Sequence, residues 1–167
     1  DLHLHLDGSI SKDNFIYLSK RQHVPLGDDF PNCISVDESC TSLEDFLEKF
    51  NLPISLLQGK DYLSYCAECL VDRLYKDNFI YAEIRFAPCL HCEKGLTQEE
   101  VVEAVLSGIN KSVQSHRGIE IGLILCCMRH VKDESNKETI ATAIKFKDKG
   151  VVAVDLAGAE KCKPTKY

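Results

Sequence analysis

Alternating apolar and polar residues predict four short β-strands along the chain. In residues 2–7, three leucines alternate with His3, His5 and Asp7, and Gly8 ends the run. The other predicted strands cover residues 79–87, 119–128 and 151–157. The pattern in residues 2–7 is the clearest, because it places apolar and ionisable side chains on opposite sides of the strand.

Apolar residues at helical spacing fill the intervals between these strands. The predicted helices cover residues 12–22, 43–58, 61–76, 97–115 and 135–149. Ser11 is a suitable N-cap for the first helix, and Pro53 is expected to kink or split the second. Possible capping boxes are formed by Thr41 with Glu44, Thr97 with Glu100, and Ser135 with Glu138.

Strands that alternate with helices favour an α/β fold with parallel pairing. The second strand, like the first, has an ionisable side, formed by Tyr81, Glu83 and Arg85. A strand covered on both faces is apolar throughout, whereas the interior of a barrel can carry a polar site. A closed (β/α)8 barrel takes eight strands and roughly 250 residues. We therefore predict the N-terminal half of such a barrel, with extra helices between the first and second strands, as a single incomplete domain over residues 1–167.

Composition narrows the range of partners. The chain has 167 residues, 44% of them hydrophobic and 28% charged, which is typical of a globular protein. The formal net charge is −6 and no basic run occurs, so nucleic acid and anionic membrane surfaces are poor partners. The sequence contains no apolar stretch approaching the ~18 residues of a membrane-spanning helix. Nothing in the composition indicates an oligomeric state.

Cysteine usage indicates a reducing compartment. The nine cysteines are odd in number, and Cys126 and Cys127 are adjacent, which argues against a disulfide framework. We therefore expect free thiols and a cytoplasmic location. The chain starts with Asp1 and strand-like residues follow at once, so we expect further residues to precede it. Whether these include a targeting segment is left open.

His3 and His5 are the sharpest chemical feature. Residues i and i+2 of a strand point the same way, about 6.6 Å apart along the strand axis. Two imidazoles placed in this way can converge on one Zn²⁺ with bonds of about 2.0–2.1 Å. Asp7 continues the same side of the strand toward its carboxyl end, where barrel enzymes have their active sites.

Five segments in a fixed order cover almost the whole chain: residues 2–10 (LHLHLDGSI), 42–50, 81–88 (YAEIRFAP), 126–130 (CCMRH) and 154–158 (VDLAG). Together they resemble the adenosine deaminases of the metal-dependent amidohydrolase superfamily. The resemblance implies a (β/α)8 barrel that hydrolyses the 6-amino group of adenosine or 2′-deoxyadenosine, giving inosine and ammonia in purine salvage. Asp7 favours this family over related adenine deaminases, which usually carry Glu at that position.

The resemblance also implies roles for individual residues. His3 and His5 would be zinc ligands, and His5 would also contact the bound purine nucleoside. Asp7 would accept a hydrogen bond from the ribose 5′-hydroxyl, and the backbone N–H of Gly158 would donate to purine N3. Zinc would activate the water that attacks C6, while a carboxylic acid protonates N1.

Several groups that the resemblance implies have no counterpart in residues 1–167. They are a third zinc histidine and a proton-donating Glu on the fifth strand, an orienting His on the sixth, and an Asp zinc ligand on the eighth. We therefore assign no catalytic residue to this chain, and we expect it to bind zinc poorly and to be inactive by itself. Ala159 stands where the family usually carries Asp, which puts the loop after the fourth strand in doubt.

Cysteine pairs offer two different zinc-based interpretations. Cys66 with Cys69 and Cys89 with Cys92 have the spacing of a four-cysteine zinc site. With Glu68 as an acid/base, the same residues imitate the signature of cytidine-type deaminases. Both are disfavoured because Cys66 and Cys69 fall on the apolar side of a predicted helix.

Two further functions are compatible with the opening motif. A deaminase-like branch that acts on N6-methylated AMP has a similar motif but tends to carry Asn where this chain has Asp7. A barrel relative kept as a non-catalytic binding module would need neither the remaining zinc ligands nor the proton-donating Glu.

Charged residues on the second and third strands are expected to support the site. For Glu83 and Arg85 a catalytic role is the alternative, but we expect them to form a buried ion pair that holds the floor of the barrel. Arg129 and His130 follow the third strand, so we expect them near the mouth of the site in a supporting role.

Overall fold

Four strands pair in the order β1-β2-β3-β4, and every neighbouring pair is parallel. The computed structural model describes residues 1–36, 38 and 40–160. The strands are Leu4–His5 (β1), Tyr81–Phe86 (β2), Glu120–Met128 (β3) and Val151–Ala157 (β4). Because parallel neighbours need a crossover, each connection contains helices, as the α/β prediction requires.

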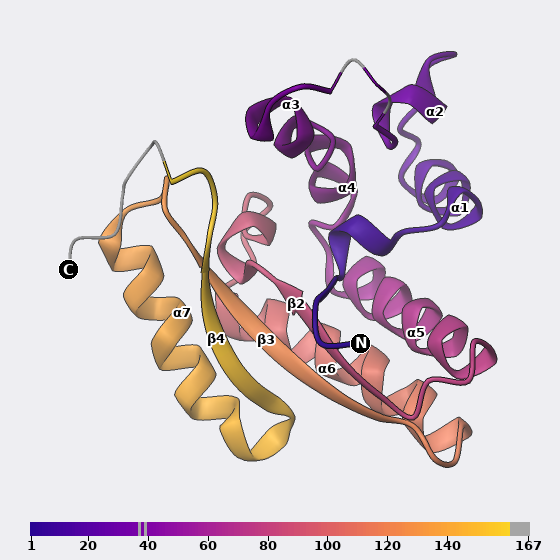
Figure 1. Cartoon of the computed structure of the whole chain (residues 1–167). Coiled ribbons are helices and arrows are strands. Elements are labelled where there is room, and N and C mark those ends of the chain that lie inside the picture. Colours follow the sequence, from indigo (N-terminus) through magenta and orange to yellow (C-terminus); the bar gives the residue numbers. More distant parts are fainter. Residues whose placement is uncertain (37, 39, 161–167) are drawn as a thin grey trace.

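The helices form two groups (Figure 1). The α-helices are Lys12–Gln22 (α1), Phe30–Cys33 (α2), Leu43–Glu48 (α3), Asn51–Leu56 (α4), Lys60–Lys76 (α5), Gln98–Ser115 (α6) and Asp133–Phe146 (α7). Short 3-10 turns cover Asp7–Ser9 (η1), Pro88–His91 (η2) and Lys147–Lys149 (η3). In Figure 1, α5, α6 and α7 run along the sheet, whereas α1–α4 lie together on the far side of β1. Within the described residues no helix is both long and apolar enough to cross a membrane.

The sheet buries one face under helices. Ala82, Ile84 and Phe86 of β2 are at most 1% exposed and belong to one apolar cluster with α5 and α6. Tyr81, Glu83 and Arg85 alternate with them on the opposite side, which we call the open face. The one-sided polarity predicted from the sequence is therefore present in the structure.

Both edges of the sheet are open within the described part of the chain. β1 pairs only with β2, and β4 pairs only with β3. Val152, Val154 and Leu156 on β4 remain 54%, 49% and 44% exposed. Unpaired edges with apolar side chains are what half of a closed barrel presents.

The first strand is shorter than the sequence suggested, and the second predicted helix is divided. The first strand ends at His5, because Asp7 begins the η1 turn, although the Leu6 N–H still donates to the Arg85 carbonyl at 2.9 Å. The predicted helix over residues 43–58 is split into α3 and α4. Proline cannot tolerate the carbonyl four residues before it inside a helix, and the break lies at Lys49, four residues before Pro53.

Helix caps agree with the sequence in two of four cases. The Ser11 side chain accepts from the Asn14 N–H, and Thr97 with Glu100 forms a complete capping box. The N-cap of α3 is Ser42 in place of Thr41, and the side chain of Glu44 lies outside the described residues. The Ser135 box is wrong: α7 begins at Asp133, so Ser135 lies inside the helix, where its hydroxyl contacts the side chain of Gln98 instead.

His91 is fully buried at the end of η2. Its Nδ1 lies 2.9 Å from the Leu57 carbonyl oxygen, while Nε2 is buried without a hydrogen-bond partner among the described residues. Burial lowers the pKa of His91 from 6.5 to about 4, since a charged imidazole would lose its hydration.

The contribution of His91 to folding stability should therefore fall as the pH drops from about 6.5 to about 4, whereas the raised pKa of Asp7, about 6, acts in the opposite direction. The unfolded chain binds a proton in this window and the folded chain does not, and at about 1.4 kcal/mol per pKa unit the loss is on the order of 3 kcal/mol. Urea unfolding at several pH values measures it. In His91→Asn, which keeps a donor toward Leu57, this loss should be absent, so the free energy of unfolding of the wild type relative to the variant should fall by that amount as the pH drops. The exposed His23→Asn variant should follow the wild type at every pH, and an equal change relative to wild type there would contradict the assignment.

Gly108 lets α5 and α6 approach closely. A Cβ at this position would lie 2.1 Å from the backbone oxygen of Ser64, which cannot move without shifting α5. We expect Gly108→Ala to lower the free energy of unfolding by about 1–3 kcal/mol, despite the higher helix propensity of alanine. Gly27→Ala is the control, because no described atom lies within 4 Å of its added Cβ. Equal urea midpoints for the two variants would refute this account.

Candidate active site

His3 and His5 lie side by side on the open face of the sheet. Their ring centroids are 5.3 Å apart and their Nε2 atoms are 3.3 Å apart. Two nitrogens that bind one Zn²⁺ tetrahedrally at about 2.0–2.1 Å are separated by about 3.3 Å. The pair therefore fits two positions of a zinc site, although its role as a ligand pair stays a prediction.

The surroundings of His5 favour the neutral imidazole. Burial lowers its pKa, and the neighbouring His3 and Arg85 lower it further, whereas Asp155 acts in the opposite direction. A metal binds the neutral ring through a nitrogen lone pair, so this environment suits metal ligation.

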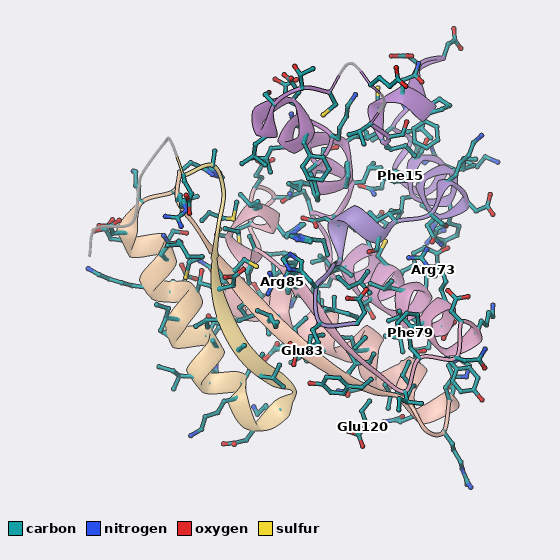
Figure 2. All side chains as sticks on the ribbon, in the orientation of Figure 1. Phe15, Arg73, Phe79, Glu83, Arg85 and Glu120 are labelled. Atoms are coloured by element: carbon teal, nitrogen blue, oxygen red, sulfur yellow. The ribbon has the colours of Figure 1, made fainter. Side chains whose placement is uncertain are left out.

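Arg85 has a different partner from the one predicted. Figure 2 shows Glu83 and Arg85 on the same strand, and the predicted ion pair between these two described residues is absent. Arg85 Nη1 donates to Asp155 Oδ2 at 3.0 Å and lies 3.1 Å from His3 Nε2. Glu83 instead accepts a 2.8 Å hydrogen bond from the Tyr81 hydroxyl. Side chains at positions i and i+2 of a strand point in the same direction and do not converge on each other. Each of the two can therefore bind a closer partner on another residue.

Asp7 is buried where β1 leads into η1. Its Oδ1 accepts from the Gly8 N–H at 3.0 Å and lies 4.0 Å from His5 Nδ1. Burial raises the pKa of Asp7 to about 6, and the backbone N–H groups only partly oppose this shift.

A pocket of about 480 Å³ opens beside these residues. Its lining includes the three predicted substrate-binding residues, namely His5, Asp7 and Gly158. His3 is not part of the lining. The other lining residues come from α3, α4 and the segments that follow β2, β3 and β4: Phe46, Leu47, Glu48, Phe50, Asn51, Ile54, Phe86, Ala87, Leu90, Glu93, Cys126, Met128, His130, Ala157 and Ala159. The helices inserted between β1 and β2 thus form one side of the pocket.

Gly158 ends β4 in a conformation that favours glycine. Its φ is +98°, in the left-handed region, which strains residues with a Cβ. Ala159, where the sequence departs from the family pattern, follows Gly158, is buried and lines the pocket. His130 also lines the pocket, as expected, and Arg129 forms a 3.4 Å ion pair with Glu160.

The sequence alone did not single out Asp155 as a site residue. Its signal is one carboxylate inside the apolar run of residues 151–157. Phe46 and Phe50, which stack edge to face at 5.4 Å, were also missed as pocket residues. The hydrophobic pattern around these residues predicts a helix, but it does not show that this helix packs beside the strands that carry the polar side chains.

Cysteines form no alternative metal centre in the part of the chain that the structure describes. Cys66 and Cys69 lie within α5, and Cys89 and Cys92 lie at η2. Within residues 1–36, 38 and 40–160, no three or more His, Cys, Asp or Glu side chains are grouped so as to hold a metal. Burial raises the pKa of the Cys66 and Cys92 thiols, to about 12 and about 11, which keeps them protonated.

Comparison with known proteins places this geometry in a family. The family model described as adenosine deaminase matches residues 1–167. A curated adenosine deaminase of Clostridium perfringens is 44% identical over 164 residues, which cover 96% of this chain and 49% of the relative. The chain thus spans about half the length of the curated relatives it matches.

Solved structures share the fold. A structure of Arabidopsis N6-mAMP deaminase matches with a TM-score of 0.79 at 26% identity, over 95% of this chain and 49% of that one. A Burkholderia ambifaria amidohydrolase with bound Zn matches with a TM-score of 0.82 at 18% identity, over 98% and 45%. The parallel sheet therefore corresponds to half of the barrel of these proteins, and this chain belongs to the adenosine deaminase family.

Proposed function

We propose that the protein containing this chain hydrolyses adenosine or 2′-deoxyadenosine to inosine or 2′-deoxyinosine and ammonia, with Zn²⁺ as cofactor. The observation that carries the proposal is the pair of Nε2 atoms 3.3 Å apart, next to a pocket lined by His5, Asp7 and Gly158. Membership in the family and the zinc-containing structural neighbour support it. The free cysteines of the described residues favour a cytoplasmic location as part of the same proposal.

His3 and His5 would hold the ion through Nε2. Zinc in such a site polarises water for attack on an aromatic carbon. The pocket residues of this chain would bind and orient the substrate. Asp7 would accept a hydrogen bond from the ribose 5′-hydroxyl, the Gly158 N–H would donate to purine N3, and Phe46 and Phe50 would exclude bulk water from the base.

The two histidines are tested by removing them one at a time. In the protein expressed from its complete gene, His3→Ala and His5→Ala should each weaken zinc binding and lower kcat/KM for adenosine more than about 100-fold. The reason is that losing even an outer-sphere partner of a ligand costs about 10–100-fold. Metal analysis and inosine release are the measurements. His23→Asn, at the exposed end of α1, should change neither, and full zinc occupancy in His5→Ala would reject the proposed site.

We also propose that the 167-residue chain is inactive by itself. Its described residues bring two imidazoles together but no third ligand, and two ligands leave a tetrahedral site incomplete. The chain expressed alone should release no inosine from adenosine and should lose zinc to a weak chelator, while the complete protein retains both properties. Turnover by the isolated chain would contradict this.

Deamination of N6-methylated AMP is the second candidate, and the match to the Arabidopsis N6-mAMP deaminase favours it. The buried carboxyl of Asp7 opposes it, because at neutral pH this group is ionised and would repel a 5′-phosphate. The complete protein should therefore show a higher kcat/KM for adenosine than for N6-methyl-AMP. The reverse preference would establish the second candidate in place of the first, and turnover of neither would indicate a binding module.

A further inference from the structure

One cation lies next to the two histidines and is not explained by the proposed reaction. The Arg85 side chain is 13% exposed, and its Nη1 lies 3.1 Å from His3 Nε2 and 3.4 Å from His3 Nδ1. Although Arg85 is paired in register with His5, its guanidinium reaches back to His3, two residues earlier. A positive group against a metal ligand opposes the binding of a dication unless its charge is balanced.

Asp155 supplies that balance from a distant strand. The same Nη1 donates to Asp155 Oδ2 at 3.0 Å, so one nitrogen contacts both the carboxylate and the imidazole. In register, Arg85 of β2 is opposite Ile124 of β3, whereas Asp155 of β4 is opposite Cys126. The ion pair therefore reaches diagonally over β3 and connects β4 to His3, which directly precedes β1.

A bulge places Asp155 on the open face. The register shifts between Leu123 and Ile124: Leu123 is opposite Val151, but Ile124 is opposite Ala153. Without the extra residue, Val152, Cys126 would be opposite Val154, and Asp155 would point toward the helices. A shift of one residue moves every following side chain to the other face, and bulges of this kind re-aim side chains near functional sites.

We propose that Asp155 is a positioning residue of the metal site: its carboxylate holds Arg85 Nη1 and balances the guanidinium charge, which keeps this cation from occupying His3 Nε2, the nitrogen that would bind the metal. This proposal rests on the proposed role of His3 and His5 as metal ligands. A merely structural ion pair would affect folding stability alone. The positioning role makes zinc affinity depend on Asp155, and it makes that dependence conditional on Arg85.

The test is a double-mutant cycle in the protein expressed from its complete gene. Zinc dissociation constants are measured by competition with a chromophoric chelator, and thermal unfolding of the metal-free protein is followed in parallel. Asp155→Asn should weaken zinc binding about 10–100-fold, the range found for outer-sphere partners of metal ligands. Arg85→Met should not weaken it, because it removes a cation that competes with the metal for His3 Nε2. The double variant Arg85→Met/Asp155→Asn should bind zinc more tightly than Asp155→Asn, since no unbalanced guanidinium remains.

Controls separate this proposal from the proposed reaction. Glu83→Gln changes a carboxylate on the same face of the sheet. This carboxylate accepts a hydrogen bond from Tyr81, and its replacement should leave zinc affinity unchanged. Asp155→Glu keeps the charge and should retain zinc affinity close to wild type, which keeps the test valid if Asp155→Asn folds poorly. Wild-type zinc affinity in Asp155→Asn, or a double variant weaker than Asp155→Asn, would overturn the positioning role and leave the proposed function intact. Absence of zinc from the wild-type protein would overturn both.

Discussion

Parallel pairing of the first residues with β2 is the interaction on which the site depends. The Leu6 N–H donates to the Arg85 carbonyl, and the Glu83 N–H donates to the Asp1 carbonyl. These bonds fix the register, so His3 and His5 face the open side while Leu4 and Leu6 face the helices. A slip by one residue would bury both imidazoles among apolar side chains. A segment with only two residues in regular ladder pairing thus determines where the chemistry is located.

The open face is a balanced set of charges and not a general polar surface. Arg85 contacts His3, Asp155 neutralises Arg85, and Glu83 is bonded separately to Tyr81. Asp7 stands apart, buried at the end of β1, with a pKa raised to about 6. Each ionisable side chain therefore has its own environment, although all of them lie on one side of a short sheet. Ion pairs that are partly buried are stable only when such partners are supplied.

The helices between β1 and β2 give the pocket its wall. Pro53 prevents one continuous helix and lies in the first turn of the second one, so α3 and α4 meet at an angle beside the carboxyl ends of the strands (Figure 1). Phe46 and Phe50 bring aromatic rings to the pocket that Ala157 and Gly158 also line. Helices inserted between two strands in this way add an apolar wall for a flat ligand without changing the order of the strands.

Local patterns in the sequence were sufficient for the order of the strands, the parallel half-barrel and the approach of His3 to His5, but they did not predict α2. These depend on periods of 2 and 3.6 residues, which neighbouring residues define by themselves. Helix limits were less certain where a cap competed with another partner, as at Ser135. Only the tertiary structure decided that Arg85 joins Asp155 instead of Glu83, because a bulge in β4 reverses the faces of the residues that follow it. Contacts across three strands depend on how the strands are aligned with one another. The hydrophobic pattern within a single strand does not determine this alignment.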